Sequence, residues 1–168
     1  MSNMKTLILM RHAKSSWKDH EIADSERPLK KRGKKDAQMM AKILLEKELL
    51  PQKLLASSAK RSRRTAEIII EETKGDFPVE YLDQLYMAEV PVYFELLNSI
   101  GDDLERVMII GHNPSLESLL QVLSNQIESL PAGAAALISL PIKSWKELNS
   151  DTKCDLIDLY KPKHEKEK

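Results

Sequence analysis

Histidine and arginine side chains follow several of the short apolar runs in this 168-residue chain. Arg11 and His12 come directly after the first run, Arg61 comes shortly after the second, and His112 follows a later one. Arginine offers forked, permanently charged donors that match phosphate oxygens, while imidazole can serve as a nucleophile or as a hydrogen-bond donor. If these strand ends meet in one pocket, the combination favours phosphoryl chemistry.

Each of these features also has a simpler explanation. An ordinary strand end that reaches water would account for Arg11 and His12, and a capping or packed side chain would account for His112. His112, however, precedes a predicted helix start, whose free N–H groups and positive dipole end favour an anion. Because the ends of three predicted strands carry the same kinds of residue, we prefer the interpretation that these side chains share one pocket.

The basic segment 61–64 contains three arginines, of which one is expected to face the pocket. Arg61 lies four residues before Thr65, on the buried stripe of a predicted helix, and therefore projects from the same side. Arg63 is expected on the outer side, and Arg64 is the second choice.

The elements that must position these side chains follow from the spacing of apolar residues. Compact apolar runs predict strands over 5–10, 53–57, 79–82 and 106–110. Spacings of three and four residues predict amphipathic helices over 31–48, from 61 to 70 and from 93 to 100. Asn113 is expected to cap a fourth helix, with Pro114 in its first turn. Two further strands, over 134–140 and 154–160, are expected to form an antiparallel edge.

Strands that alternate with amphipathic helices predict an α/β fold. We expect a three-layer α/β/α sandwich whose mostly parallel sheet is covered on both faces and carries an antiparallel edge. One domain is expected over 1–160, followed by a charged tail over 161–168. In such sheets ligands bind beyond the carboxyl ends of the strands, which is where the arginines and histidines lie.

The composition restricts the classes of partner. The chain has 26 basic and 26 acidic residues, so no overall positive field draws it to nucleic acid or to an anionic membrane. The apolar run at 7–10 is too short for a signal peptide, and no stretch approaches the roughly 18 apolar residues of a membrane span. The single cysteine, Cys154, fits a reducing compartment. We therefore expect a cytoplasmic protein without nucleic-acid or membrane partners.

Neither a metal nor a cofactor is expected. His20 and His164 lie in polar segments without the paired spacing of a zinc site. No glycine-rich phosphate loop or dinucleotide fingerprint follows any predicted strand. The densest cationic run, Lys30 to Lys35, is interpreted first as the exposed start of a helix and second as a docking surface for an acidic protein partner.

Three segments, taken in order, resemble the motifs of a known family. Residues 9–17 (LMRHAKSSW) resemble the Arg-His-Gly signature of the histidine phosphatase superfamily, with Ala13 in place of the usual glycine. Residues 57–67 (SSAKRSRRTAE) resemble its second arginine motif, and residues 109–113 (IIGHN) resemble its second histidine motif. The short length and residues 24–29 (DSERPL) are similar to the SixA-type branch. The resemblance implies a phosphoglycerate mutase-like fold.

By this resemblance, His12 is a nucleophile that forms a phosphohistidine, while Arg11, Arg61 and His112 bind the phosphate. No metal or cofactor is needed. The second ring nitrogen of His12 is expected to donate to a backbone carbonyl, which fixes the tautomer.

The remaining assignments leave alternatives open. Ser15 and Lys18 are expected to add contacts to the substrate, with Lys18 standing where the mutase branch has asparagine. Asp83 is the first choice for the general acid, and Glu89 and Asp24 are its rivals.

The resemblance implies a metal-independent phosphatase whose substrate is phosphohistidine in a protein, such as a histidine-containing phosphotransfer domain. A broad phosphomonoesterase acting on small phosphorylated metabolites is the alternative within the same class of enzyme. An inactive phosphate-binding module is the alternative from another class. Without a firmly placed acid, cleavage of P–N bonds is expected to be favoured over cleavage of unactivated P–O bonds.

Overall fold

The computed structural model describes residues 4–163, so the predicted charged tail lies outside the described residues beyond Lys163. Its centre is a six-stranded sheet with the strand order β3-β2-β4-β1-β5-β6. The strands are β1 (Lys5–Arg11), β2 (Lys53–Ser57), β3 (Val79–Leu82), β4 (Arg106–Gly111), β5 (Ala135–Leu140) and β6 (Asp155–Tyr160). β1 to β4 run parallel, whereas β5 is antiparallel to β1 and β6 is antiparallel to β5. The predicted antiparallel edge is confirmed.

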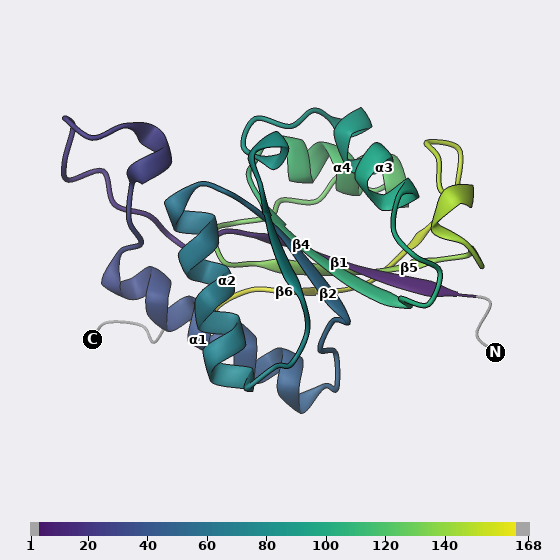
Figure 1. Cartoon of the computed structure of the whole chain (residues 1–168), viewed down its shortest axis with the longest axis horizontal. Helices are drawn as coiled ribbons and strands as arrows, with labels where there is room; N and C mark the ends of the chain where they lie inside the picture. Colours follow the sequence, from purple (N-terminus) through teal and green to yellow (C-terminus); the bar gives the residue numbers. More distant parts are fainter. Residues whose placement is uncertain (1–3, 164–168) are drawn as a thin grey trace.

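Helices cover both faces of this sheet (Figure 1). α1 (Lys31–Glu46) and α2 (Lys60–Thr73) lie on one side, and α3 (Val90–Asn98) and α4 (Ser115–Ser124) lie on the other. The alternation of side chains along β1 explains the two layers of core. Leu7 and Leu9 pack in the core beneath α3 and α4, whereas Ile8 and Met10 pack in the core beneath α1 and α2. The predicted three-layer α/β/α sandwich is confirmed.

β1 lies inside the sheet, between β4 and β5. In its register with β4, Met10 pairs with Ile110 and Arg11 pairs with Gly111. The N–H of His12 donates to the carbonyl of Gly111 at 3.1 Å, which continues the ladder by one residue. The two strands therefore deliver His12 and His112 to the same point at the edge of the sheet.

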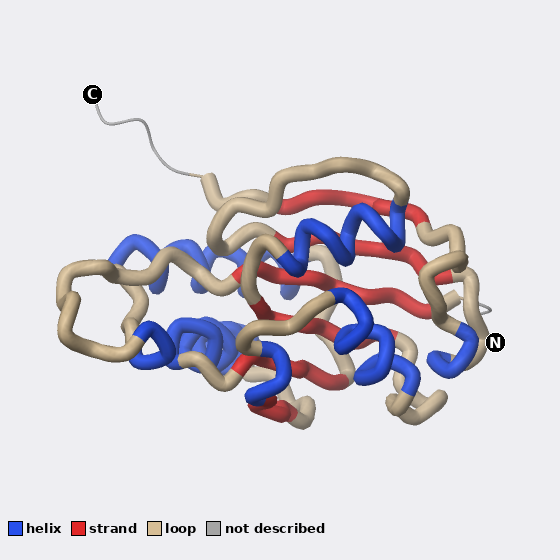
Figure 2. Tube along the Cα trace, turned by 90° about the horizontal axis from the view of Figure 1, so that it is seen from above, coloured by secondary structure: helices blue, strands red, loops and turns tan. Residues whose placement is uncertain are grey.

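The connection between β1 and α1, residues 12–30, extends beyond the end of the sheet where the parallel strands finish (Figure 2). It doubles back on itself, because Ser15 forms an antiparallel bridge with Leu29. A short 3-10 helix, η1 (Asp24–Glu26), lies within it. Two similar turns, η2 (Asp83–Leu85) and η3 (Trp145–Glu147), occur later in the chain.

Gly33, in the first turn of α1, is placed against this connection. A Cβ atom at Gly33 would lie 2.2 Å from the carbonyl oxygen of Lys14, a distance that no real pair of such atoms adopts. The same carbonyl accepts a hydrogen bond of 2.9 Å from the N–H of Lys30. Glycine therefore allows the start of α1 to lie directly on the backbone that follows His12.

Three predicted helix boundaries are wrong. α3, predicted to end at 100, ends at Asn98. α1 ends at Glu46 rather than 48, because Glu48 adopts a left-handed backbone with φ of 55°. α4 begins at Ser115, with Pro114 rather than Asn113 in the capping position. The amide nitrogen of Asn113 donates to the carbonyl of Leu130 at 2.8 Å, and its Oδ1, the atom that would cap the helix, accepts no hydrogen bond among the described residues. Across residues 4–163, no helix is both long and apolar enough to cross a membrane.

Candidate active site

A cavity of about 710 Å³ lies beyond the carboxyl ends of β1 and β4. Its walls come from the β1–α1 connection, the first turns of α1 and α2, and the segment that follows η2. The four residues expected to form a phosphate site, Arg11, His12, Arg61 and His112, all line it. The structure thus brings together side chains from three separate strand ends.

His12 is buried, with 7% of its surface exposed. Its Nδ1 lies 2.8 Å from the carbonyl oxygen of Ala13. A carbonyl can only accept, so the proton resides on Nδ1 and the lone pair on Nε2, as expected. Burial, together with electrostatic repulsion from His112, Arg61 and Arg11, lowers the pKa of His12 to about 3 against the opposing effect of the Ala13 hydrogen bond. The imidazole is therefore neutral at physiological pH.

His112 lies beside His12, with 5.1 Å between the ring centroids. Its Nε2 is 2.7 Å from the hydroxyl oxygen of Ser57, at the end of β2. Its Nδ1 faces Arg61 at 3.5 Å. Burial, and then the positive charge of Arg61, lower the pKa of His112 to about 4 against the opposing effect of Asp24. This second imidazole is also neutral, and Ser57 holds its orientation.

Arg61 reaches the cavity from the first turn of α2. Its Nε donates to Nε2 of His12 at 3.3 Å, and its terminal nitrogens donate to the backbone carbonyl and the carboxylate of Asp24 at 2.8 and 3.0 Å. Thr65 fixes this turn, because its hydroxyl donates to the carbonyl of Arg61 and accepts from the N–H of Ala13. Arg61 and Thr65 therefore lie on the same side of α2, as their spacing of four residues predicts.

The other two arginines of the segment 61–64 lie outside the cavity. The guanidinium of Arg63 stacks over the ring of Tyr81 at 4.3 Å. Arg64 forms an ion pair with Glu71 at 3.1 Å on the exposed side of α2. The prediction that only one arginine of this segment faces the pocket agrees with this placement.

Arg11 contributes donors that are not fully used. One of its terminal nitrogens lies 3.5 Å from the carbonyl of Leu130, at the limit of a hydrogen bond. Its Nε is buried and has no hydrogen-bond partner among the described residues. A buried donor without an acceptor costs free energy, on the order of 1–3 kcal/mol, unless a ligand satisfies it. Arg11 is therefore well suited to contact an anion in the cavity.

Arg27 is a site residue that the sequence reasoning missed. It is 6% exposed and donates to the carboxylate of Asp24 at 2.8 Å, to the hydroxyl of Ser15 at 2.5 Å and to the carbonyl of Ser16 at 3.0 Å. The ring of Trp17 stacks on its guanidinium at 3.1 Å. The only available signal was its place in residues 24–29, which carry the resemblance to the SixA-type branch.

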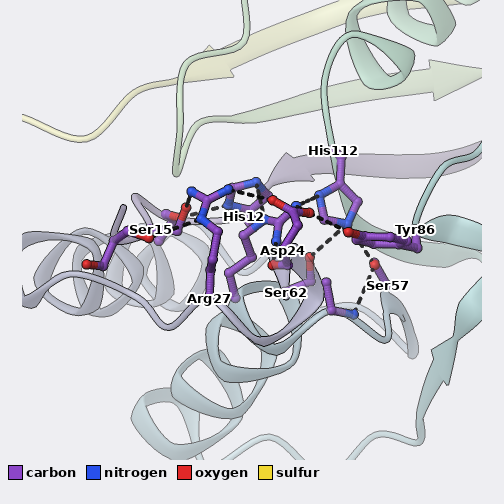
Figure 3. A network of polar contacts seen from close by, with 12 residues as sticks. His12, Ser15, Asp24, Arg27, Ser57, Ser62, Tyr86 and His112 are labelled. Atoms are coloured by element: carbon purple, nitrogen blue, oxygen red, sulfur yellow. Dashed lines mark hydrogen bonds and ion pairs between the residues drawn. The ribbon is translucent and has the colours of Figure 1, made fainter. Parts of the chain in front are cut away.

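Asp24 joins the two buried arginines across the cavity (Figure 3). Its carboxylate also accepts a short hydrogen bond from the hydroxyl of Tyr86, a second residue that the sequence reasoning missed. The hydrogen bond from Tyr86, and then those from Arg27 and Arg61, hold the pKa of Asp24 well below its usual range. The same contact raises the pKa of the Tyr86 hydroxyl. Asp24 is therefore an anion that organises the arginines and is a poor proton donor.

The remaining predicted residues are distributed between the cavity and its surroundings. Ser15 lines the cavity, where its hydroxyl accepts from Arg27. Lys18 is exposed and lines a separate hollow on the β1–α1 connection. Asp83 lines another hollow, together with Ser58 and Arg63. The structure therefore does not bring Lys18 or Asp83 to the phosphate site.

Glu89, the second candidate for the general acid, lies in a hollow next to the cavity. This hollow shares Tyr86, Met87 and His112 with the cavity. Glu89 is exposed and precedes the first residue of α3. Among residues 4–163, no group of three or more His, Cys, Asp or Glu side chains is arranged to hold a metal ion.

A neutral imidazole with an unprotonated Nε2, set among buried arginines at the end of a parallel sheet, is suited to phosphoryl transfer. Residues 7–88 match the sequence pattern of the histidine phosphatase superfamily, branch 1. An uncharacterized chloroplastic protein of Arabidopsis thaliana is 34% identical over 152 residues, covering 85% of this chain and 70% of that protein. An uncharacterized protein of Mycobacterium tuberculosis is 35% identical over 130 residues, covering 77% of this chain and 78% of that protein. The chain belongs to the histidine phosphatase superfamily.

Several solved structures share the fold of this chain. A structure assigned to the phosphohistidine phosphatase SixA of Agrobacterium tumefaciens has a TM-score of 0.81 at 24% identity, covering 94% of this chain and 98% of that chain. The protein histidine phosphatase SixA complexed with tungstate has a TM-score of 0.81 at 20% identity, covering 94% and 97%. A structure assigned to the α-ribazole-5′-P phosphatase of Escherichia coli has a TM-score of 0.69 at 15% identity, covering 97% and 99%. The predicted phosphoglycerate mutase-like fold is confirmed.

Proposed function

We propose that this phosphatase transfers the phosphoryl group of its substrate to His12, and that the substrate is phosphohistidine in a protein. The observation that carries the first part is the tautomer of His12. Because Nδ1 donates to the carbonyl of Ala13, the lone pair of Nε2 is directed toward the arginines of the cavity. A lone pair in that position is the nucleophile that a covalent mechanism needs.

The reaction proceeds in two transfers. In the first, Nε2 of His12 forms a bond to phosphorus while the bond from phosphorus to the leaving group breaks, and the leaving group departs with that electron pair. Arg11 and Arg61 donate to the equatorial oxygens, on which negative charge accumulates, and His112 joins them through its Nδ1–H when the hydroxyl of Ser57 donates to its Nε2. In the second, a water oxygen forms a bond to phosphorus, the P–N bond to His12 breaks, and inorganic phosphate is released.

The choice of substrate follows from proton supply. An alkyl phosphate expels an alkoxide that needs a proton during bond cleavage, whereas a phosphoramidate already protonated on nitrogen leaves as a neutral amine or imidazole. Asp24, the carboxylate nearest to Arg61, is held in its ionised form. Asp83 lies in another hollow, and Glu89 is exposed in a hollow beside the cavity rather than in the cavity itself. A site with this weak supply of protons favours P–N bonds, and the similarity of fold to SixA structures supports the same substrate class.

A comparison of substrates tests this proposal. We expect kcat/KM to be highest for a phosphohistidine-bearing phosphotransfer domain and for phosphoramidate, intermediate for an aryl phosphate and lowest for sugar phosphates. Equal rates on alkyl monoesters and phosphohistidine would favour the broad phosphomonoesterase. Failure to release inorganic phosphate from any of them would favour a phosphate-binding module.

The covalent step is tested by rapid quenching under neutral conditions with labelled phosphoramidate. We expect label on His12, located by peptide mass spectrometry, and none in a His12→Asn variant. Label on His112 would contradict the assignment of the nucleophile.

A further inference from the structure

The cavity is much wider than a phosphoryl group. Its volume is about 710 Å³. At about 30 Å³ for each water molecule, this is room for roughly twenty waters. The inner part is occupied by the two histidines and the buried arginines, so the outer part must receive something other than the transferred phosphoryl group.

One side of this outer part is basic. Lys14, Lys30 and Arg32 line the cavity, and Lys14 and Lys30 are exposed. The close approach at Gly33 holds these residues together, because it places the first turn of α1 on the backbone of Lys14. Although the whole chain has no net charge, six arginines and lysines line the cavity against two aspartates. The positive field is therefore concentrated at this opening.

The helical geometry directs the side chains of the cationic run 30–35 to different sides. Lys30 and Arg32 face the cavity, whereas Lys34 and Lys35 are exposed and do not line it. Lys34 and Lys35 therefore provide a control pair of lysines outside the cavity, with the same charge as a pair of lysines that line it.

Two large apolar side chains are exposed on the same opening. Trp17 is 63% exposed and Met87 is 84% exposed, and both line the cavity. The ring of Trp17 is held in place by its stacking on Arg27, so little conformational freedom is lost when a partner covers it. Tryptophan, methionine and arginine are enriched at protein interfaces. A small metabolite inside the cavity would leave these outward-facing side chains uncovered.

We propose that Lys14, Trp17, Lys30, Arg32 and Met87 form a docking surface for a folded protein with an acidic face around its phosphorylated histidine. This inference rests on the proposed function and adds the property by which the substrate protein is recognised. The basic residues pair with carboxylates of the partner, while Trp17 and Met87 cover its apolar surface. The phosphorylated side chain then extends between them to His12.

The test compares two enzymes on two substrates. The double variant Lys14→Glu/Lys30→Glu is measured against Lys34→Glu/Lys35→Glu, with an acidic phosphohistidine-bearing phosphotransfer domain and with phosphoramidate. We expect the first variant to lose about 10-fold to 100-fold in kcat/KM on the domain and no more than about threefold on phosphoramidate, because rim charges act mainly on association. The control pair should stay within about twofold on both substrates. Turnover of phosphoramidate also reports that each variant is folded.

A second variant, Met87→Ala, tests the apolar part without changing charge. We expect it to raise KM for the domain and to leave KM for phosphoramidate unchanged. Equal losses on both substrates, no loss on the domain, or equal effects of the two charge-reversed pairs would overturn the docking surface. If the wild-type enzyme releases phosphate from neither substrate, the proposed function itself fails. If it releases phosphate from both and the variants match it, only the docking surface fails.

Discussion

Arg61 contacts the proposed nucleophile, the second histidine and Asp24 at the same time. A guanidinium has five N–H donors in a fixed plane, so it can keep its contact with Asp24 while it receives a phosphate oxygen. Asp24 therefore orients Arg61 before the substrate arrives. Donors that are already aligned cost little reorganisation in the transition state.

Replacement of this arginine is expected to be far more harmful than replacement of its neighbour. Arg61→Ala should lower kcat/KM by about 100-fold to 1000-fold, because a donor to the charge of the transition state is lost. Arg63→Ala removes only the stacking on Tyr81 outside the cavity and is the matched control. Steady-state kinetics with phosphoramidate would measure both. Similar losses in the two variants would mean that Arg61 has no special role.

The two remaining candidates for the general acid, Asp83 and Glu89, can be distinguished by replacing each carboxylate with the corresponding amide. Asp83→Asn is expected to leave the slow hydrolysis of sugar phosphates unchanged, because Asp83 lies in a different hollow from the histidines. Loss of a true general acid would instead cost about 100-fold to 10,000-fold. Glu89→Gln is the parallel variant, since its hollow shares His112 with the cavity. A large loss in either variant, seen only with alkyl esters, would identify the acid.

The first turn of α1 depends on a single residue, Gly33, for its close contact with the β1–α1 connection. Replacement of glycine by alanine within a helix usually stabilises a protein by about 1 kcal/mol. At Gly33 the sign should reverse, because the new Cβ would lie 2.2 Å from the backbone oxygen of Lys14. We expect Gly33→Ala to lower the free energy of unfolding in urea and, by displacing Lys14 from the cavity, to lower kcat/KM for a phosphohistidine-bearing phosphotransfer domain. Lys34→Ala, at the next position of the helix, is the control, and a Gly33→Ala protein more stable than wild type would contradict this account.

Strands and helices could be predicted from the sequence where a single physical rule decides the local structure. The apolar runs fixed the strands, and the four-residue spacing between Arg61 and Thr65 identified the arginine that faces inward. Arg27 and Tyr86 were not predictable in this way. Arg27 lies in a long connection whose path depends on contacts distant in sequence, such as those from Arg61 to Asp24, 37 residues apart. Tyr86 reaches the site through a hydrogen bond to Asp24, 62 residues earlier in the chain, and no local periodicity encodes it.

The start of α4 likewise depends on a contact that the local sequence does not encode. Asn113 is a residue type that often caps helices, yet its amide nitrogen donates to the carbonyl of Leu130 and its oxygen accepts no hydrogen bond from the helix start. Local propensity therefore located α4 to within two residues but did not identify its first one. The site is unaffected, because His112 precedes this boundary and is held by β4 and Ser57.

For the molecule as a whole, two buried neutral histidines make stability depend on pH. The pKa of His12 is about 3 in the folded protein, whereas an unfolded histidine has a pKa of about 6.5. Between these values the unfolded chain binds more protons, so stability is lost as pH falls from about 6.5 toward 3. His112, with a folded pKa of about 4, acts in the same direction.

We therefore expect His12→Asn to reduce the sensitivity of the protein to acid. Between pH 8 and pH 5, the free energy of unfolding of this variant should fall by about 2 kcal/mol less than that of wild type. Urea denaturation at the two pH values would measure the difference. His20→Asn removes an exposed histidine and should retain the wild-type dependence. A His12→Asn protein with the same dependence as wild type would show that His12 does not stay neutral in the folded state.

The position of β1 between β4 and β5 also has a consequence for how the enzyme is made. The strand that carries His12 is synthesised first, but its two neighbours end at Gly111 and Leu140. Until both have left the ribosome, the apolar residues of β1 have no partner and are exposed to chaperones and to aggregation. A chain that stops after α4 holds both histidines and every arginine of the site, yet its central strand is open on one side. The nascent enzyme can therefore become active only when most of its chain has been translated.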